Sequence, residues 1–198
     1  MEEKTGSESP EELSIYNKLY LAIIMKYKSY IEEKENVYAA ELPKLILPDN
    51  KAVLALAGKV KSEMPHYDYE KNFEVALKTA FEQVSTQIAT VTLPVQFWLL
   101  PEQTLEIGAG DAFDKANLLC SVLIALGNIS SKTIITINDT KRTLGVYCEY
   151  KDKIIYADLE KGIKKFSSKE KLLGALGIGK DENLAAYEFN DKMFNNLA

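Results

Sequence analysis

The residues best placed to do chemistry surround one stretch of the chain, Gly108 to Leu119, with the sequence GAGDAFDKANLL. Two glycines, an aspartate and an apolar run predict a tight turn that leads into the start of a helix. Folds place nucleophiles at such a start, because the free N–H groups stabilise negative charge and lower a thiol pKa. The residue delivered there is Ala112, which has no reactive atom. The stretch is therefore either an active site without its nucleophile or only a helix start.

Few other residues could replace the missing group. The chain holds two cysteines, Cys120 and Cys148, and one histidine, His66. Cys120 lies two turns into the predicted helix and Cys148 in a predicted strand, so we expect both thiols to be buried, protonated and structural. His66 lies in a predicted loop, where a lone histidine is usually solvated. This inventory predicts no disulfide framework, no metal site and no cofactor.

The hydrophobic pattern predicts the elements that position this turn. Apolar residues at helical spacing, with capping signals, predict helices over 10–35, 52–64, 72–88, 101–105 and 111–126. The helix 111–126 is apolar nearly all round, so it is expected to be central, with Gly127 as its C-cap. Short β-branched and aromatic runs then predict an antiparallel meander of strands over 133–137, 144–150 and 154–158. The fold class is α+β, with a buried helix packed on a sheet.

A chain of 198 residues is long enough for one domain with helical extensions. We expect four segments along it. They are a disordered lead-in over 1–8, an N-terminal helical extension over 9–49 that ends in an irregular connector at 42–49, a core over 50–162, and a C-terminal helical segment over 163–198 that packs on the core.

Composition narrows the class of function. The chain is 46% hydrophobic and 27% charged, with a net charge of −5, which is ordinary for a soluble globular protein. No dense Lys/Arg stripe is visible, so a nucleic-acid partner is not expected. The longest apolar run near the N-terminus, Leu19–Met25, is too short to span a membrane, so no membrane partner is expected either. The acidic start is unlike a secretory leader, and we expect a cytoplasmic protein.

Several motifs in order resemble one family. Phe97–Leu105 (FWLLPEQTL), Gly110–Ala116 (GDAFDKA), Leu118-Leu119 and Ala125–Gly127 resemble the pattern of archaeal-type transglutaminase-like proteins. That pattern runs aromatic-Trp, Pro-Glu-x-Thr-Leu, Gly-Asp-Cys-x-Asp, Leu-Leu and Ala-x-Gly. The resemblance covers roughly residues 50 to 160, and it implies a papain-like core whose enzymes use a Cys-His-Asp triad.

The resemblance also implies where that triad would lie. The Cys position is Ala112. Aligning Val146–Tyr150 under the family's His-Ala-Trp-x-Glu strand puts the His position at Gly145, and only the Asp position, Asp158, is kept. The resemblance thus implies the fold while the residues contradict the activity, since alanine and glycine have no groups for it. Two losses on different elements favour a naturally degenerate member over an engineered Cys→Ala substitution.

Further residues are candidates to line the former cleft: Trp98, Glu102, Asp111, Asp114 and Tyr147. Trp98 is interpreted either as a cleft residue or as core packing beside the helix start. The three acidic residues could hold a hard cation such as Ca²⁺. We favour a structural interpretation, in which Asp111 caps or flanks the helix and Asp114 makes a structural hydrogen bond, and we expect no metal.

A near match to a phosphate loop, Gly174–Asp181, fails because Asp181 replaces the required hydroxyl and a helix precedes it. A helix C-cap followed by a glycine turn explains it better.

Three functions remain. The first is a catalytically inactive transglutaminase-like domain that binds a protein or peptide through its cleft or its N-terminal helix. The second is an active cysteine peptidase or transglutaminase-type acyl transferase that appears here as a Cys→Ala variant. The third is an assembly subunit that forms an oligomer through the aromatic face of residues 13–31.

Overall fold

The chain divides into two compact units. They are Met1–Asn36 with Leu93–Phe97, and Val37–Thr92 with Trp98–Ala198. The computed structural model describes residues 10–34, 39–92, 94–95, 97–138, 142–179 and 183–197. The predicted lead-in over 1–8 lies outside these ranges.

The first unit is helical, as the pattern of residues 10–35 predicts, but two helices take the place of the single predicted one. It contains α1 (Pro10–Lys26) and α2 (Lys28–Lys34), which are separated at Tyr27. Large apolar side chains are exposed on the two helices and at the turn between them: Ile15, Leu19, Tyr20, Leu21, Ile23, Met25, Tyr27 and Tyr30. Within the described ranges, no helix combines the length and apolar character that crossing a bilayer requires.

The second unit begins with helices that polar side chains cap. A 3₁₀ helix (Ala39–Leu45) precedes α3 (Lys51–Ser62) and α4 (Tyr69–Gln87). The Asn50 side chain accepts a hydrogen bond from the Ala52 N–H at 2.8 Å, and the Asp68 side chain accepts one from the Glu70 N–H at 2.9 Å. Two expectations need correction. The 3₁₀ helix extends into the first four residues of the predicted irregular connector, 42–49, and α4 starts three residues before the predicted 72 because Asp68 caps it.

Six antiparallel strands form the main sheet. They are β3 (Lys132–Ile137), β4 (Arg142–Tyr150), β5 (Lys153–Asp158), β6 (Gly162–Phe166), β7 (Ala185–Phe189) and β8 (Phe194–Asn196), in the spatial order β6-β5-β4-β3-β7-β8. The three predicted strands are confirmed as β3, β4 and β5. A short parallel pair, β1 (Ala89–Thr90) and β2 (Ala109–Gly110), lies beside α5 (Pro101–Ile107).

The C-terminal expectation is wrong. Within 163–198, the only described helix is α7 (Lys169–Ala175), while β6, β7 and β8 extend the sheet. The strand β7 pairs with β3 inside the sheet. Its alternation is hard to recognise from sequence, because Glu188, a charged residue, occupies one of its buried positions. At the predicted glycine turn, α7 ends and Gly177 follows with φ 86°.

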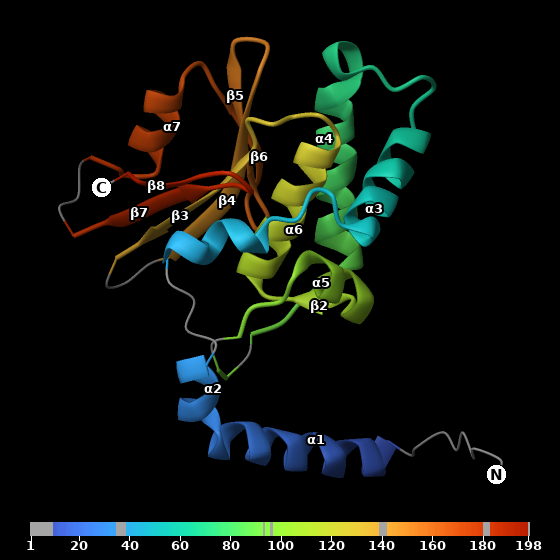
Figure 1. Cartoon of the computed structure of the whole chain (residues 1–198), viewed down its shortest axis with the longest axis vertical. Helices are drawn as coiled ribbons and strands as arrows, with labels where there is room; N and C mark the ends of the chain where they lie inside the picture. The colour runs from blue at the N-terminus through green and yellow to red at the C-terminus, as the bar shows by residue number, and fades with distance from the viewer. Residues whose placement is uncertain are drawn as a thin grey trace. The chain divides into compact units, whose positions relative to one another are not determined.

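Helices cover both faces of the sheet (Figure 1). The central helix α6 (Ala112–Ala125) packs on one face, where it meets Val146 and Ile155, and α7 packs on the other, where Leu172 joins Ile134. The helices α3 and α4 lie on the far side of α6. Because the sheet covers α6 on one side and these helices cover it on the other, every residue from Phe113 to Leu123 is buried. This arrangement explains the all-round apolar pattern of α6.

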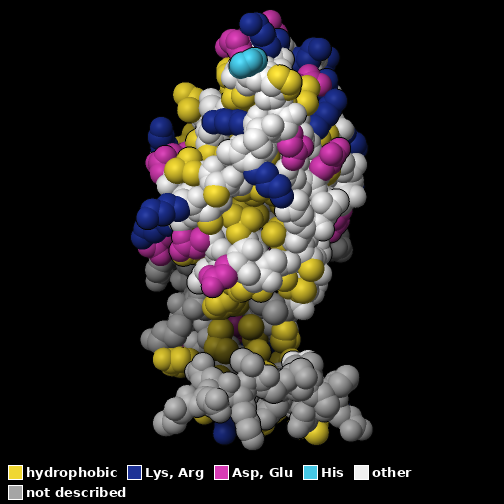
Figure 2. Space-filling model, turned by 90° about the vertical axis from the view of Figure 1, so that its right-hand side faces the viewer, with side chains coloured by type: hydrophobic (Ala, Val, Ile, Leu, Met, Phe, Trp, Pro, Cys, Tyr) yellow, Lys and Arg dark blue, Asp and Glu magenta, His cyan; other side chains and the backbone are white. Residues whose placement is uncertain are grey.

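The face viewed in Figure 2 mixes both signs of charge, with Lys/Arg and Asp/Glu side chains interspersed among apolar patches. The histidine in that view lies at its upper end, and His66 is exposed in the loop between α3 and α4. No basic stripe is visible on this face.

Candidate functional site

A cleft of about 200 Å³ lies at the N-terminus of α6. It is bounded by α6, by the first residues of β4 and by the turn after β5. Its lining consists of Asp111, Ala112, Phe113, Ala116, Arg142, Thr143, Leu144, Asp158, Leu159, Glu160 and Lys161. Two of the three positions that the family resemblance singles out, Ala112 and Asp158, therefore line one cleft.

Two glycines shape the turn that leads into the cleft. Gly108 ends α5 in the left-handed region, with φ 69°. At Gly110 a Cβ atom would lie 3.0 Å from Cβ of Asp114, a tight contact, so glycine lets the chain approach α6 without displacing Asp114. Asp111 then caps the helix, because its Oδ1 accepts hydrogen bonds from the N–H groups of Phe113 at 2.7 Å and Asp114 at 2.9 Å. The predicted cap is confirmed.

Asp114 ties the start of α6 to the segment before α5. Its Oδ1 accepts a hydrogen bond from the Leu99 N–H at 2.8 Å, and its Oδ2 accepts one from the Asp111 N–H at 2.9 Å. Burial is the main influence on this carboxyl, and it raises the pKa of Asp114 to about 6 although both backbone hydrogen bonds lower it. The predicted structural hydrogen bond is confirmed, and Asp114 does not line the cleft.

Asp158, to which the family resemblance assigns the acidic triad position, is hydrogen-bonded to the residues of its own turn. Its Oδ1 accepts hydrogen bonds from the N–H groups of Glu160 at 2.9 Å and Lys161 at 3.0 Å. Its Oδ2 accepts one from Nζ of Lys161 at 3.0 Å. Both carboxylate oxygens thus hold the turn after β5, whereas a triad aspartate orients an imidazole.

Gly145 does not line the cleft that Ala112 and Asp158 share. A Cβ atom on Gly145 would lie 2.5 Å from Cε2 and 2.6 Å from Cζ of Tyr156, whose ring packs in the core on the α7 face of the sheet. The residues of β4 that line the cleft are Arg142, Thr143 and Leu144. Neighbouring strand residues point to opposite faces, so a shift of one position along β4 decides whether a side chain can reach the cleft.

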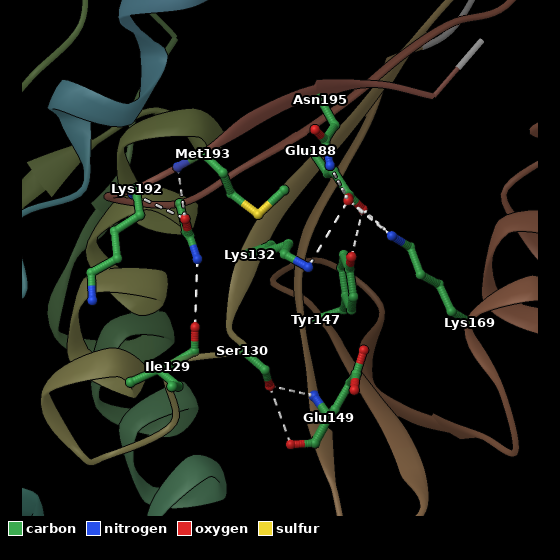
Figure 3. Close-up of polar contacts among 11 residues, drawn as sticks. Ile129, Ser130, Lys132, Tyr147, Glu149, Lys169, Glu188, Lys192, Met193 and Asn195 are labelled. Carbon is green, nitrogen blue, oxygen red and sulfur yellow. Dashed lines mark hydrogen bonds and ion pairs between the residues drawn. The ribbon is translucent and has the colours of Figure 1, made fainter.

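Tyr147 does not line the cleft, so the prediction that it is a cleft residue is wrong. It is fully buried on the α7 face, and its hydroxyl donates a hydrogen bond to Oε2 of Glu188 at 2.5 Å. In Figure 3, the carboxylate of Glu188 is surrounded by Tyr147, by Lys169 from α7, by Asn195 from β8 and by Lys132 from β3. Its Oε1 accepts hydrogen bonds from Lys169 at 2.8 Å and Asn195 at 3.0 Å. The motif alignment could not show which face Tyr147 occupies.

The charge of Glu188 is retained inside the protein. Burial by itself would raise the pKa of Glu188, but the hydrogen bonds from Lys169, Tyr147 and Asn195 outweigh it and hold the pKa below its ordinary value. The sequence motifs do not point to Glu188, because its hydrogen-bond partners come from α7, β4 and β8.

The other candidates lie outside the cleft lining. Trp98 is partly buried, and its ring centroid is 5.0 Å from that of Phe113, so it packs behind a lining residue. Glu102 is exposed on α5 and accepts a hydrogen bond from the side chain of Asn50. Of the five predicted cleft residues, only Asp111 is part of the lining. Over the described ranges, no three His, Cys, Asp or Glu side chains are grouped as a metal site would require.

Both thiols lie in the core, as predicted. Cys120 and Cys148 are completely buried, and burial raises the pKa of each to about 12. A thiol in this state is protonated at neutral pH and a poor nucleophile.

Comparisons with known proteins identify the fold. No family model matches the chain, and no curated protein matches it. Two solved structures of Legionella pneumophila LapG do match, one of them EGTA-treated, each with a TM-score of 0.50 and 18% sequence identity. Each match covers 74% of this chain, and 74% of the EGTA-treated and 76% of the other LapG chain. The chain has an α+β, transglutaminase-like (papain-like) fold, with a buried central helix packed on an antiparallel sheet. The expectation about fold is confirmed.

Proposed function

We propose that this protein is a non-catalytic transglutaminase-like domain that binds a peptide or protein segment in the cleft at the N-terminus of α6. One observation carries the proposal. The family resemblance implies that the active site of a papain-like enzyme would lie at this helix start, yet the lining of the cleft contains neither a thiol nor an imidazole. Ala112 stands at the helix start, and the oxygens of Asp158 are already hydrogen-bonded to their own turn.

Neither of the two cysteines nor the single histidine lies where it could supply the missing thiol or imidazole. Thiol catalysis needs a thiolate with a base within hydrogen-bond reach. Cys120 and Cys148 are buried with raised pKa values, and the single histidine, His66, lies in the loop between α3 and α4. A cleft that holds no reactive pair can bind a chain segment without cleaving or cross-linking it.

The test is a combined turnover and binding experiment on the purified protein. Peptide and glutamine-carboxamide substrates are incubated with the protein in the presence of a primary amine, and mass spectrometry detects products. We expect no hydrolysis or cross-linking above the protein-free blank. Binding of the same peptides is measured by calorimetry. The variant Ala112→Leu, which fills the cleft at a helical position that tolerates leucine, should lose the binding. Turnover by the unaltered protein would overturn the proposal.

A cysteine variant tests whether the site has lost several catalytic groups or only its thiol. Iodoacetamide should alkylate the thiol of Ala112→Cys, and only the start of α6 should lower its pKa, because no imidazole lines the cleft. The variant should show no turnover. Leu144→His added to Ala112→Cys would bring an imidazole into the cleft lining, whereas Gly145→His would meet the Tyr156 ring. Thiol-dependent turnover by Ala112→Cys alone would mean that the rest of an active site is intact, against the proposal.

A further inference from the structure

The cleft contains the only arginine of the chain. Arg142 is the single arginine among 24 basic residues, and all the others are lysines. Arginine differs from lysine in carrying a planar guanidinium that stacks on aromatic rings and offers several N–H donors in a fixed fork. The single guanidinium of a chain whose other basic residues are lysines therefore lies in the lining of this cleft.

A cluster of aromatic rings lies next to that guanidinium. The Arg142 guanidinium carbon lies 5.4 Å from the ring centroid of Phe113, the second residue of α6. The Phe113 ring in turn packs against Trp98 and, at a centroid distance of 6.0 Å, against Phe189. Phe113 is only 2% exposed, so Arg142 rests on a ring that the core holds in place. A cation–π contact uses none of the guanidinium N–H groups as hydrogen-bond donors, so they stay available for an anion.

The other charges of the lining are largely engaged within the protein. Asp111 caps α6, and Asp158 and Lys161 pair with each other at 3.0 Å. Glu160 is exposed on the turn after β5. In the ranges of the chain that the structure covers, the Phe113 ring is the one recorded partner of the Arg142 guanidinium. The cation best placed to receive a ligand's charge is therefore Arg142.

The remaining lining is apolar and small. Ala112, Ala116, Leu144 and Leu159 contribute short or aliphatic side chains to it. A volume of about 200 Å³ is below the usual range for drug-sized ligands, and it suits a single amino-acid side chain. The cleft thus combines an apolar pocket for one side chain with a cation at its edge.

We propose that the cleft recognises a peptide carboxylate next to an apolar side chain, with Arg142 as the carboxylate receptor. The inference rests on the proposed peptide-binding function and adds the class of peptide. Two sources share this chemistry: the free C-terminus of a chain, and an internal Asp or Glu side chain. A forked guanidinium binds either one through parallel N–H···O hydrogen bonds.

The experiment uses the full chain and defined peptides in titration calorimetry. The first pair is acetyl-Gly-Leu with a free carboxylate and its C-terminal amide. The second pair is acetyl-Leu-Glu-Gly amide and the same peptide with Gln in place of Glu. We expect the acid of at least one pair to bind about fivefold to tenfold more tightly than its neutral partner. The pair that shows this difference identifies the source of the carboxylate.

Variants locate the effect. Arg142→Gln should abolish the preference for the acid, and Arg142→Lys should retain part of it, because it keeps the charge but loses the fork. Lys164→Gln on β6, outside the cleft lining, is the matched control and should leave it unchanged. Thermal unfolding of each variant checks that the fold is intact. Added salt should weaken the preference, since Arg142 is exposed.

The possible failures are distinguishable. If acids and amides bind equally and Ala112→Leu blocks both, the carboxylate inference is wrong while peptide binding in the cleft stands. If Arg142→Gln keeps the full preference, another cation is the receptor and the inference is equally wrong. If none of the four peptides binds, the inference is overturned. The proposed function then depends on the turnover assay and on other peptides.

Discussion

Replacing Gly145 with alanine should destabilise the protein, although the change adds a single methyl group to a strand. The new Cβ would lie 2.5, 2.6 and 2.7 Å from Cε2, Cζ and Oη of Tyr156. Carbon atoms in proteins pack at about 3.5–4.0 Å, so the ring would have to move by about 1 Å. The ring is 4% exposed, and its hydroxyl donates a hydrogen bond to the Leu144 carbonyl at 3.4 Å. It therefore has little room to move without a loss of packing.

The magnitude follows from two contributions. Overpacking a core site costs about 1–3 kcal/mol, and loss of the Tyr156 hydrogen bond costs about 1 kcal/mol. We expect Gly145→Ala to lower the free energy of unfolding by about 2–4 kcal/mol. Urea unfolding followed by circular dichroism measures this change. A domain of this size should remain folded, because typical stabilities are about 5–15 kcal/mol.

Two companion variants show whether the Tyr156 ring is the cause. Tyr156→Val makes room, so adding Gly145→Ala to it should cost much less than in the unaltered protein. Gly58→Ala in α3 is the matched control. A Cβ at Gly58 meets no atom within 4 Å, and the change should stabilise the helix by up to about 1 kcal/mol. If the free energy of unfolding of Gly145→Ala lies within about 0.5 kcal/mol of that of the unaltered protein, the predicted clash does not exist.

Three further predictions concern other parts of the chain. Burial raises the pKa of Asp114 to about 6, so the folded state keeps this proton at pH values where the unfolded chain has lost it. The stability deficit of Asp114→Asn should therefore shrink as the pH rises from about 4 to 7 in chemical unfolding, and a growing deficit would contradict the assignment. Ellman's reagent should label neither Cys120 nor Cys148 in the folded protein and both in urea, so a fast-reacting thiol would disprove their burial. Light scattering should find the full chain associated and a chain lacking residues 1–36 monomeric, because α1 and α2 expose large apolar side chains. If the two chains have the same oligomeric state, the protein does not assemble through these helices.

Much of the fold could be predicted from local signals. Helical spacing, caps and the change to strand alternation identify α1, α3, α4, α6 and the meander β3–β5. The sequence did not identify β7, because Glu188 interrupts its apolar pattern. In the folded protein, hydrogen bonds from Lys169, Tyr147 and Asn195 stabilise the buried carboxylate of Glu188. Partners from α7, β4 and β8 are not visible in the residues next to Glu188.

By itself the sequence determined the α+β class, the glycine turn before α6, the aspartate cap and the absence of a thiol at Ala112. These depend on residue types and short spacings, which act within one or two turns of chain. Only the tertiary structure decided which residues meet at the cleft. It brought Ala112 and Asp158 together, directed Gly145 and Tyr147 toward the α7 face, and set Arg142 on Phe113. Strand register and packing control these contacts, and a shift of one residue exchanges the two faces of a strand.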